Sequence, residues 1–280
     1  MDEGGATMKV EGAAAVVTGA AGGIGLAVAR ALLERGAASV VLADLDGDRL
    51  SDASSALGEE FGERVLHRAA DVTAEIGVDA VLQTSPTPVD LYVANAGVFR
   101  GFGLDASPQD WAASWDVNVM AHVAAARALV PQWLERGATD GPAGCFVSVA
   151  SAAGLLTQLG SPTYSVTKHA AVGFAEWLAA TYGDRGVQVT TACPMGVRTA
   201  MLEEGETSTD ADARLGMRAV TSAGEPLDAT VVAATILDAV EAGRFQALPH
   251  PEVATMWAQK ASDPDRWVAG MQRYRRALES

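Results

Sequence analysis

A tyrosine and a lysine are the residues of this sequence best suited to proton chemistry. Tyr164 and Lys168 are four positions apart, so a helix places both side chains on one face. An ammonium beside a phenol favours the phenolate and lowers a phenol pKa that starts near ~10. Such a tyrosine can act as a general acid or base on an alcohol or a carbonyl. The spacing is common by chance, however, and alone it indicates an exposed helical pair.

A serine ahead of this pair favours the catalytic interpretation. Ser151 follows an apolar segment that reads as a strand, CFVSVA, and a short loop separates it from the helix that carries Tyr164. Its hydroxyl can hydrogen-bond a substrate oxygen and orient that oxygen towards Tyr164. Ser148 is the competing candidate, and we prefer Ser151 because Ser148 should lie within the strand.

A glycine-rich turn near the start of the chain is typical of dinucleotide binding. The segment TGAAGGIG, with Gly19, Gly23 and Gly25, lies between a predicted strand and a predicted helix. Glycines let the backbone turn tightly and approach a pyrophosphate at the positive end of the helix. A plain strand-to-helix turn would look the same, so the motif alone leaves both interpretations open.

Aspartates and an asparagine end the strands that follow. Asp44 lies 19 residues after Gly25, where a carboxylate accepts hydrogen bonds from an adenosine ribose and repels a 2′-phosphate, so we expect NAD rather than NADP. Asp71 can accept from the adenine amino group, and Asn95 and Gly97 lie at the end of the fourth strand. Both aspartates can instead be helix caps or turn residues with no role in cofactor binding. Because ligands bind beyond the carboxyl ends of parallel strands, these motifs converge on one crevice.

Short apolar segments alternate with longer helical patterns along most of the chain. This alternation predicts βαβ units, and therefore an α/β fold in which helices cover both faces of a parallel sheet. Ser161 and Pro162, an N-cap and a first-turn proline, predict where the helix of Tyr164 begins. Strands are expected at 13–18, 39–43, 64–69, 90–94, 144–149, 187–192 and 244–248, and helices at 24–35, 109–136, 162–183 and 227–242.

The chain is expected to form one domain. It should cover residues 9–249, between a disordered N-terminus at 1–8 and a helical C-terminal extension at 250–280. The polar segment 200–226 is expected to be a long loop that forms a substrate lid. The segment 74–89 is short for the helix expected between the third and fourth strands.

Composition excludes several classes of partner. The chain has 20 Lys and Arg against 35 Asp and Glu, and its net charge of −15 would repel nucleic acid and anionic membrane surfaces. No stretch reads as a membrane span or a secretory signal. Cys145 and Cys193 lie in apolar segments and the four histidines are scattered, so we expect reduced thiols in a cytoplasmic protein and no metal site.

Taken in chain order, these motifs resemble the short-chain dehydrogenase/reductase family. The similarity runs from about residue 9 to about residue 248 and includes TGAAGGIG, the NAG of 95–97, Asn118 in DVNV, Ser151 and YSVTK. It implies a Rossmann-like, doubly wound single domain, a catalytic tetrad of Asn118, Ser151, Tyr164 and Lys168, and a homotetramer or homodimer. In that family the tyrosine exchanges the proton and the serine steadies the substrate oxygen. The lysine lowers the tyrosine pKa and holds the nicotinamide ribose, and the asparagine holds a water that relays protons, although a helical asparagine can instead bond the backbone.

The resemblance also implies the reaction and the residues that hold NAD. The expected activity is interconversion of a secondary alcohol and a ketone, and the apolar residues discussed below favour a medium-sized, apolar small-molecule substrate. Met195 stands where the family's PG segment has glycine. The cofactor-binding residues would be Gly19, Ala21, Gly23, Ile24, Gly25, Asp44, Leu45, Asp71, Val72, Asn95, Ala96, Gly97, Tyr164, Lys168, Pro194, Val197 and Thr199.

Two other functions compete with this interpretation. Ser165 and Lys168 form the SxxK of penicillin-recognising hydrolases, but the companion motifs of those enzymes do not occur. A protein of the same fold can also hold NAD as a sensor or scaffold without turnover. The apolar residues that suggest an apolar substrate pocket, or that only anchor the lid, are Leu155, Leu156, Met195, Met201, Leu202 and Met217.

Overall fold

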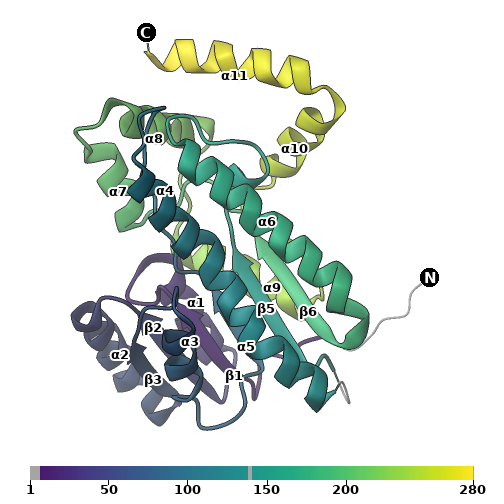
Figure 1. Ribbon diagram of the computed structural model, residues 1–280. Helices are drawn as coiled ribbons and strands as arrows, with labels where there is room; N and C mark the ends of the chain where they lie inside the picture. The colour runs from purple at the N-terminus through teal and green to yellow at the C-terminus, as the bar shows by residue number, and fades with distance from the viewer. Residues whose placement is uncertain (1–6, 138–140, 280) are drawn as a thin grey trace.

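A parallel sheet forms the centre of the computed structural model, which describes residues 7–137 and 141–279 (Figure 1). Its strands lie in the order β3-β2-β1-β4-β5-β6-β7, and every neighbouring pair is parallel. This confirms the predicted doubly wound α/β fold, with a last strand shorter than the expected 244–248. Within the described residues the strands are β1 (Ala14–Thr18), β2 (Ser39–Asp44), β3 (Val65–Ala69), β4 (Leu91–Ala94), β5 (Gly144–Val149), β6 (Val187–Ala192) and β7 (Gln246–Ala247).

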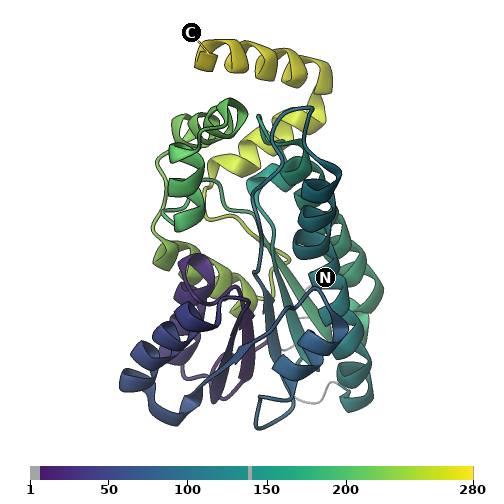
Figure 2. The ribbon, with the colours of Figure 1, turned by 60° about the vertical axis from the view of Figure 1, so that its left-hand side comes forward.

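The central strands are buried because helices cover both faces of the sheet (Figure 2). Successive side chains of a strand point to opposite faces, so Val17 and Leu42 enter one core, whereas Val16 and Val41 enter the other. The helices of the first core are α1 (Gly23–Glu34), α2 (Gly47–Phe61) and α9 (Ala229–Glu241), and those of the second are α3 (Glu75–Leu82), α5 (Ala121–Arg136) and α6 (Pro162–Tyr182). The result is a three-layer arrangement whose strands all end at one edge.

The long helix predicted over 109–136 is interrupted. Its first part is α4 (Pro108–Trp115), and a π-helical turn, Asp116–Met120, connects it to α5. The turn contains Asn118, whose side chain hydrogen-bonds the loop after β4. Because the apolar pattern continues through the turn, no sequence signal predicts it, although π turns often occur at functional sites.

The segment 200–226 is not the long loop that the sequence predicted. It contains two helices, α7 (Ala200–Thr207) and α8 (Ala211–Ala223). Asp210 caps α8 because its side chain accepts hydrogen bonds from the first-turn backbone N–H groups, and Ala213 and Met217 are buried. A capped helix with a buried face is stable in this setting despite its polar sequence.

The short connection at 74–89 also forms a helix. Its helix α3 is eight residues long and lies close to the end of β3. A Cβ at Gly77 would overlap the carbonyl oxygen of Asp71, so only glycine allows this close approach. The short connection is therefore sufficient because the helix packs at backbone distance from the turn that precedes it.

The chain ends differ from each other. The C-terminal extension consists of two helices, α10 (Glu252–Ser262) and α11 (Pro264–Glu279), as expected. Of the expected disordered N-terminus, residues 1–6 lie outside the described residues. Met8 contradicts that expectation because it is buried and its backbone N–H donates to the side chain of Gln188. No helix in the described part of the chain is long and apolar enough to cross a membrane.

Candidate active site

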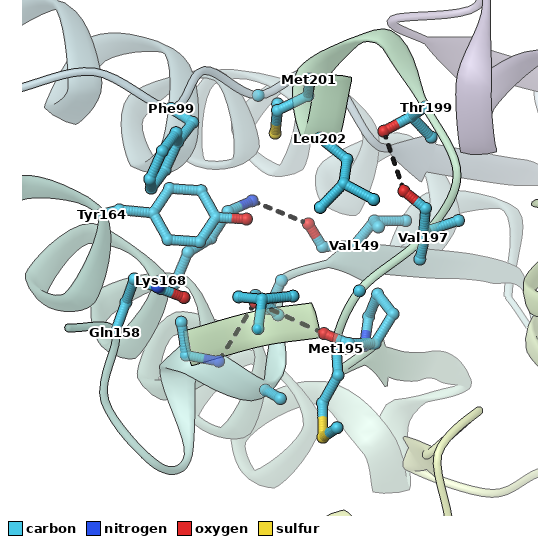
Figure 3. Close-up of a pocket in the computed structure, with 18 of the residues that line it drawn as sticks. Phe99, Val149, Gln158, Tyr164, Lys168, Met195, Val197, Thr199, Met201 and Leu202 are labelled. Atoms are coloured by element: carbon cyan, nitrogen blue, oxygen red, sulfur yellow. Dashed lines mark hydrogen bonds between the residues drawn. The ribbon is translucent and has the colours of Figure 1, made fainter. Parts of the chain in front are cut away.

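A cavity of about 1030 Å³ lies at the carboxyl edge of the sheet, where the predicted site residues converge (Figure 3). Gly25 and Asn118 are the two members of the predicted site that do not line it, and both are buried. The members that do line it are Gly19, Ala21, Gly23, Ile24, Asp44, Leu45, Asp71, Val72, Asn95, Ala96, Gly97, Ser151, Tyr164, Lys168, Pro194, Val197 and Thr199.

Tyr164 enters the cavity from the first turn of α6. Ser161 caps this helix, since its hydroxyl accepts the backbone N–H of Tyr164 at 3.3 Å and itself donates to the carbonyl oxygen of Gly101 at 2.9 Å. The ring of Tyr164 packs edge-on against Phe99, with 5.1 Å between the ring centroids. Figure 3 shows Phe99 and Tyr164 side by side at the cavity wall. The cap and the aromatic contact together hold the phenol in one position.

Burial dominates the acidity of this phenol. It raises the pKa of Tyr164, while a hydrogen bond with Ser151 lowers it, and the net direction is upward. The sequence predicted a lowered pKa because it considered only the ammonium of Lys168. In the folded chain, removing the phenolate from water outweighs the stabilisation by its neighbours.

Lys168 is buried beneath the tyrosine. Its exposed fraction is 3%, its Nζ donates to the carbonyl oxygen of Val149 at 3.1 Å, and Nζ lies 5.6 Å from the centroid of the Tyr164 ring. Burial lowers the pKa of Lys168 to about 8. A Cβ at Gly97 would lie 3.4 Å from this Nζ, so glycine keeps the space beside the ammonium open.

The two candidate serines, Ser151 and Ser148, have different surroundings. Ser151 lines the cavity, donates to the carbonyl oxygen of Pro194 at 3.4 Å and accepts the backbone N–H of Ala153 at 3.1 Å. Ser148 lies inside β5, as expected, and its hydroxyl is 3.1 Å from Nδ1 of His122. Burial lowers the pKa of that histidine to about 3, so this pair is neutral and part of the core.

Both polar side-chain atoms of Asn118 have hydrogen-bond partners within the chain. Its Oδ1 accepts the backbone N–H of Val98 at 2.9 Å, and its Nδ2 donates to the carbonyl oxygen of Val98 at 3.1 Å and to the hydroxyl of Thr167 at 3.0 Å. The structure therefore agrees with the alternative interpretation for this side chain, which bonds the backbone. It connects the loop after β4 to α6 and so fixes the position of the helix that carries Tyr164.

The glycine-rich turn brings the backbone of α1 to the cavity. Gly19 has a φ of +64°, and a Cβ at Gly25 would overlap the carbonyl oxygen of Gly19. No side chain caps α1, whose N-cap is Gly22, and its first turn contains no acidic residue. The first-turn amides and the positive end of the helix dipole are thus directed at the cavity, which fits the pyrophosphate of a dinucleotide.

The polar residues at the strand ends also hold the turns on which they lie. Asp44 accepts the backbone N–H of Ala21 at 3.0 Å, and Asn95 donates to the carbonyl oxygen of Thr18 at 2.8 Å. Asp71 accepts the backbone N–H and the hydroxyl of the residue two positions on, as a turn aspartate does. All three still line the cavity. Carboxylates at its adenosine end, glycines at its centre and Lys168 beyond them fit a nicotinamide dinucleotide.

A histidine that the sequence analysis did not single out holds the segment after β6. Nδ1 of His250 accepts the backbone N–H of Met195 at 3.1 Å, and His250 is only 3% exposed. Met195 packs against a small apolar cluster that includes Leu155, Val172 and Val253, and residues of the C-terminal extension pack against the same cluster. The departure from glycine at this position is thereby accommodated by packing. The sequence offered no signal for His250 beyond its place after β7.

Gln158 is a second residue that sequence reasoning missed. Its backbone N–H donates to the hydroxyl of Ser165 at 2.9 Å, and that hydroxyl donates to the carbonyl oxygen of Gln158 at 2.9 Å. Its Nε2 donates to the carbonyl oxygen of Gly216 in α8 at 2.9 Å. The preceding Thr157 has a φ of +131°, a conformation that β-branched residues rarely adopt. The hydroxyl of Ser165 hydrogen-bonds the backbone of Gln158, and Ser165 does not line the cavity. Ser165 is therefore not placed to act as the nucleophile that the hydrolase interpretation requires.

The comparisons with known proteins agree with this site. A family model described as "short chain dehydrogenase" matches residues 13–210. The chain is 37% identical over 202 residues to the 1-deoxy-11-beta-hydroxypentalenate dehydrogenase of Streptomyces exfoliatus, covering 70% of this chain and 71% of that protein.

Solved structures give the same result for the fold. A short chain dehydrogenase/reductase from Burkholderia phymatum in complex with NAD has a TM-score of 0.81 at 28% identity, covering 92% of this chain and 96% of the other. L-Sorbose reductase from Gluconobacter frateurii, complexed with NADPH and L-sorbose, has a TM-score of 0.73 at 30% identity, covering 86% of this chain and 96% of the other.

Proposed function

This chain belongs to the short-chain dehydrogenase family, and we propose that it interconverts a secondary alcohol and a ketone with NAD(H). The observation that carries the proposal is the position of the Tyr164 phenol, in the cavity wall with Ser151 in hydrogen-bond contact and Lys168 buried beneath it. An exposed helical pair would leave both side chains in water. Here Lys168 is buried and Tyr164 is half-buried, at the end of a glycine-lined crevice that fits a dinucleotide.

The residues divide the proton chemistry between them. Acceptance or donation of hydride is the chemistry that a bound nicotinamide supplies. Ser151 holds the substrate oxygen, and the Tyr164 hydroxyl gives it a proton in reduction or takes one from it in oxidation. Lys168 favours the phenolate through its charge, and its pKa of about 8 lets it change protonation near the working pH. Asn118 acts as a positioning residue, since it fixes α6 and the loop after β4.

The replacement Tyr164→Phe tests this function. It removes the exchangeable proton and keeps the ring that packs on Phe99, so kcat should fall at least about 100-fold while the Kd for NADH changes little. The measurements are NADH absorbance across a panel of secondary alcohols and ketones, and NADH fluorescence for binding. Full turnover in the variant would refute the assigned role of Tyr164. NADH binding without turnover by the wild-type protein would favour a sensor or scaffold.

Asp44 supports NAD as the cofactor. Its carboxylate lies at the adenosine end of the cavity and would repel a 2′-phosphate. One basic residue, Arg49, also lines this end, and an NADPH-binding relative shares the fold, so the choice needs a direct test. Asp44→Ala should weaken NAD binding roughly 10-fold or more, and it should reduce the enzyme's preference for NAD over NADP. The ratio of kcat/KM values for the two cofactors measures this, and an unchanged ratio would remove Asp44 from the cofactor site.

We also propose an apolar alcohol or ketone as substrate and a cytoplasmic homotetramer or homodimer as the working form. Phe99, Leu202 and Met217 give the substrate end of the cavity an apolar wall. A similar protein is named as the dehydrogenase of a hydroxylated compound, which supports the reaction class. Trp115 and Trp177 expose large apolar surfaces on α4 and α6, which favours burial between subunits. Sedimentation measurements of the purified protein would give the number of subunits.

A further inference from the structure

The C-terminal helix α11 forms the outer wall of the cavity. Figures 1 and 2 both show α11 beyond α8 and connected to the rest through α10. None of its residues is buried. Its contribution to the cavity lining is Arg266, Trp267, Gly270, Met271, Arg273 and Tyr274.

Two stripes run along this face of the helix. Trp267, Met271 and Tyr274 follow a helical spacing and are half-buried, so they form an apolar stripe. Arg266 and Arg273 are seven positions apart, which places them one above the other beside that stripe. The wall therefore offers an apolar surface beside two arginine side chains.

Hydrogen bonds hold this wall in place relative to the catalytic helix. The hydroxyl of Tyr274 donates to the carbonyl oxygen of Ala219 in α8 at 2.7 Å and lies 2.7 Å from the hydroxyl of Ser222. In turn α8 is bonded to Gln158, which Ser165 of α6 holds. The wall is thus connected to the turn of α6 that carries the catalytic tyrosine.

The two guanidinium groups have no carboxylate partner among the described residues, in a chain whose net charge is −15. Arg275 on the same helix does pair with Glu279, at 2.6 Å. Asp263 also lines the cavity, but its Oδ1 accepts the backbone N–H of Arg266 at 2.9 Å and so caps the start of α11. Two unpaired cations on a cavity wall favour an anionic ligand there.

Gly270 opens the wall between the two arginines. Glycine inside a helix makes the helix less stable than alanine does. A Cβ at Gly270 would meet only the guanidinium of Arg273, at 3.8 Å, so no packing contact requires the glycine. Its effect is to keep the space beside the Arg273 guanidinium free of a side chain on this face of the helix.

We propose that α11 recognises a substrate in which an apolar ring system carries a carboxylate remote from the reacting alcohol or ketone. Arg266 and Arg273 bind the carboxylate, and Trp267 and Met271 contact the apolar body. The carboxylate is far from the reacting carbon and makes the same contacts throughout the reaction, so it lowers KM and leaves kcat nearly unchanged. This assignment rests on the proposed function, because it identifies the substrate class of the same site.

Matched substrates test the assignment. Two hydroxy-acids, 4-hydroxycyclohexane-carboxylate and 6-hydroxydecalin-2-carboxylate, are compared with their primary amides by NADH absorbance. In the wild-type protein each acid should have a KM roughly 10- to 100-fold below that of its amide. Arg266→Ala and Arg273→Ala should each raise KM for the acids only. Arg275→Ala is the control, since Arg275 pairs with Glu279 and does not line the cavity.

A binding measurement keeps the test independent of turnover. With NADH present, each acid should raise the melting temperature of the wild-type protein and of Arg275→Ala more than its amide does, and this difference should disappear in the other two variants. Equal KM values for acid and amide would overturn the assignment. So would an acid-specific shift that is absent from the wild type or survives in both arginine variants. If no compound were turned over, the proposed function would be at fault, and the melting temperatures would still decide the role of α11.

Discussion

At the scale of single residues, burial moves both Tyr164 and Lys168 towards their neutral forms. It raises the pKa of Tyr164 and lowers the pKa of Lys168 to about 8. Both shifts have the same cause, since a charge loses the solvation of water when its side chain is enclosed. The hydrogen bond with Ser151 counteracts the effect of burial, because it lowers the pKa of Tyr164.

The pH dependence of alcohol oxidation should therefore depend on Ser151. Oxidation requires the phenolate, so kcat/KM rises with pH towards the pKa of Tyr164. Ser151→Ala removes the hydrogen bond that lowers this pKa, so the rise should move to higher pH, beside a loss of roughly 100-fold in rate. Profiles of kcat/KM against pH measure both effects. Ser148→Ala is the control, because Ser148 contacts His122 in the core, and a profile that did not move in Ser151→Ala would contradict the argument.

Lys168 should reduce the stability of the free enzyme at neutral pH. Its folded-state pKa of about 8 lies below the ordinary 10.5, so between these values the unfolded chain binds more protons and the free energy of unfolding rises with pH. Below pH 8 Lys168 is charged in the folded chain, so burial of its charge lowers the free energy of unfolding by the full amount. Lys168→Met should then unfold with a free energy up to about 3 kcal/mol higher at pH 7, and the gain should vanish towards pH 10.5.

Urea unfolding at several pH values measures this gain. Tyr164→Phe serves as the comparison, since it keeps the buried lysine. A difference between Lys168→Met and the wild type that stayed constant from pH 7 to pH 10 would show that the charge of Lys168 is not its origin.

At the scale of elements, the glycine-rich turn depends on a close approach between backbone atoms. A Cβ at Gly25 would meet the carbonyl oxygen of Gly19, so the first turn of α1 would have to move away. The same turn carries the amides that face the cavity. Packing of this helix and binding of the cofactor are therefore coupled at one residue.

Gly25→Ala should affect stability and cofactor binding together. We expect a loss of about 1–3 kcal/mol in the free energy of unfolding and a Kd for NADH that is at least tenfold higher. Denaturant unfolding and NADH fluorescence measure the two effects. Gly58→Ala is the matched control, because Gly58 lies within α2 with nothing within 4 Å of an added Cβ, and it should stabilise by up to about 1 kcal/mol. Unchanged NADH binding in Gly25→Ala would refute the coupling.

At the scale of the whole molecule, the cavity has an inner wall from the sheet and an outer wall from α8 and the C-terminal helices. The sheet and its covering helices form the two large cores, whereas α11 contributes no buried residue. Cofactor binding should therefore depend on the inner wall, and substrate binding on the outer one.

Removal of residues 263–280 should separate these two properties. Because no residue of α11 is buried, the shortened protein should melt within about 3 °C of the full chain and bind NADH with a similar Kd. Its KM for alcohols should rise, since the outer wall of the cavity is missing. Thermal unfolding, NADH titration and steady-state kinetics measure these outcomes, and an unchanged KM would show that α11 does not contact substrate.

The sequence by itself determined the sheet, its helical layers and the residues at its carboxyl edge. These features follow from local signals: short apolar strand segments, a Ser-Pro helix start and glycines at a strand-to-helix turn. Tyr164 and Lys168 were predicted to share a helical face, and they do. Their spacing is a property of the helix alone, so no distant contact could alter it.

Only the tertiary structure decided the features that depend on distant contacts. The direction of the Tyr164 pKa follows from burial, which the helix spacing does not reveal. The helices at 200–226 form because their apolar side packs over the cavity, and the π turn at Asn118 accompanies hydrogen bonds to Val98 in another loop. The arginines of α11 became part of the cavity only through the folding of the C-terminus over α8. Local patterns specify elements, and the free energy of burying and pairing their side chains sets the chemistry between them.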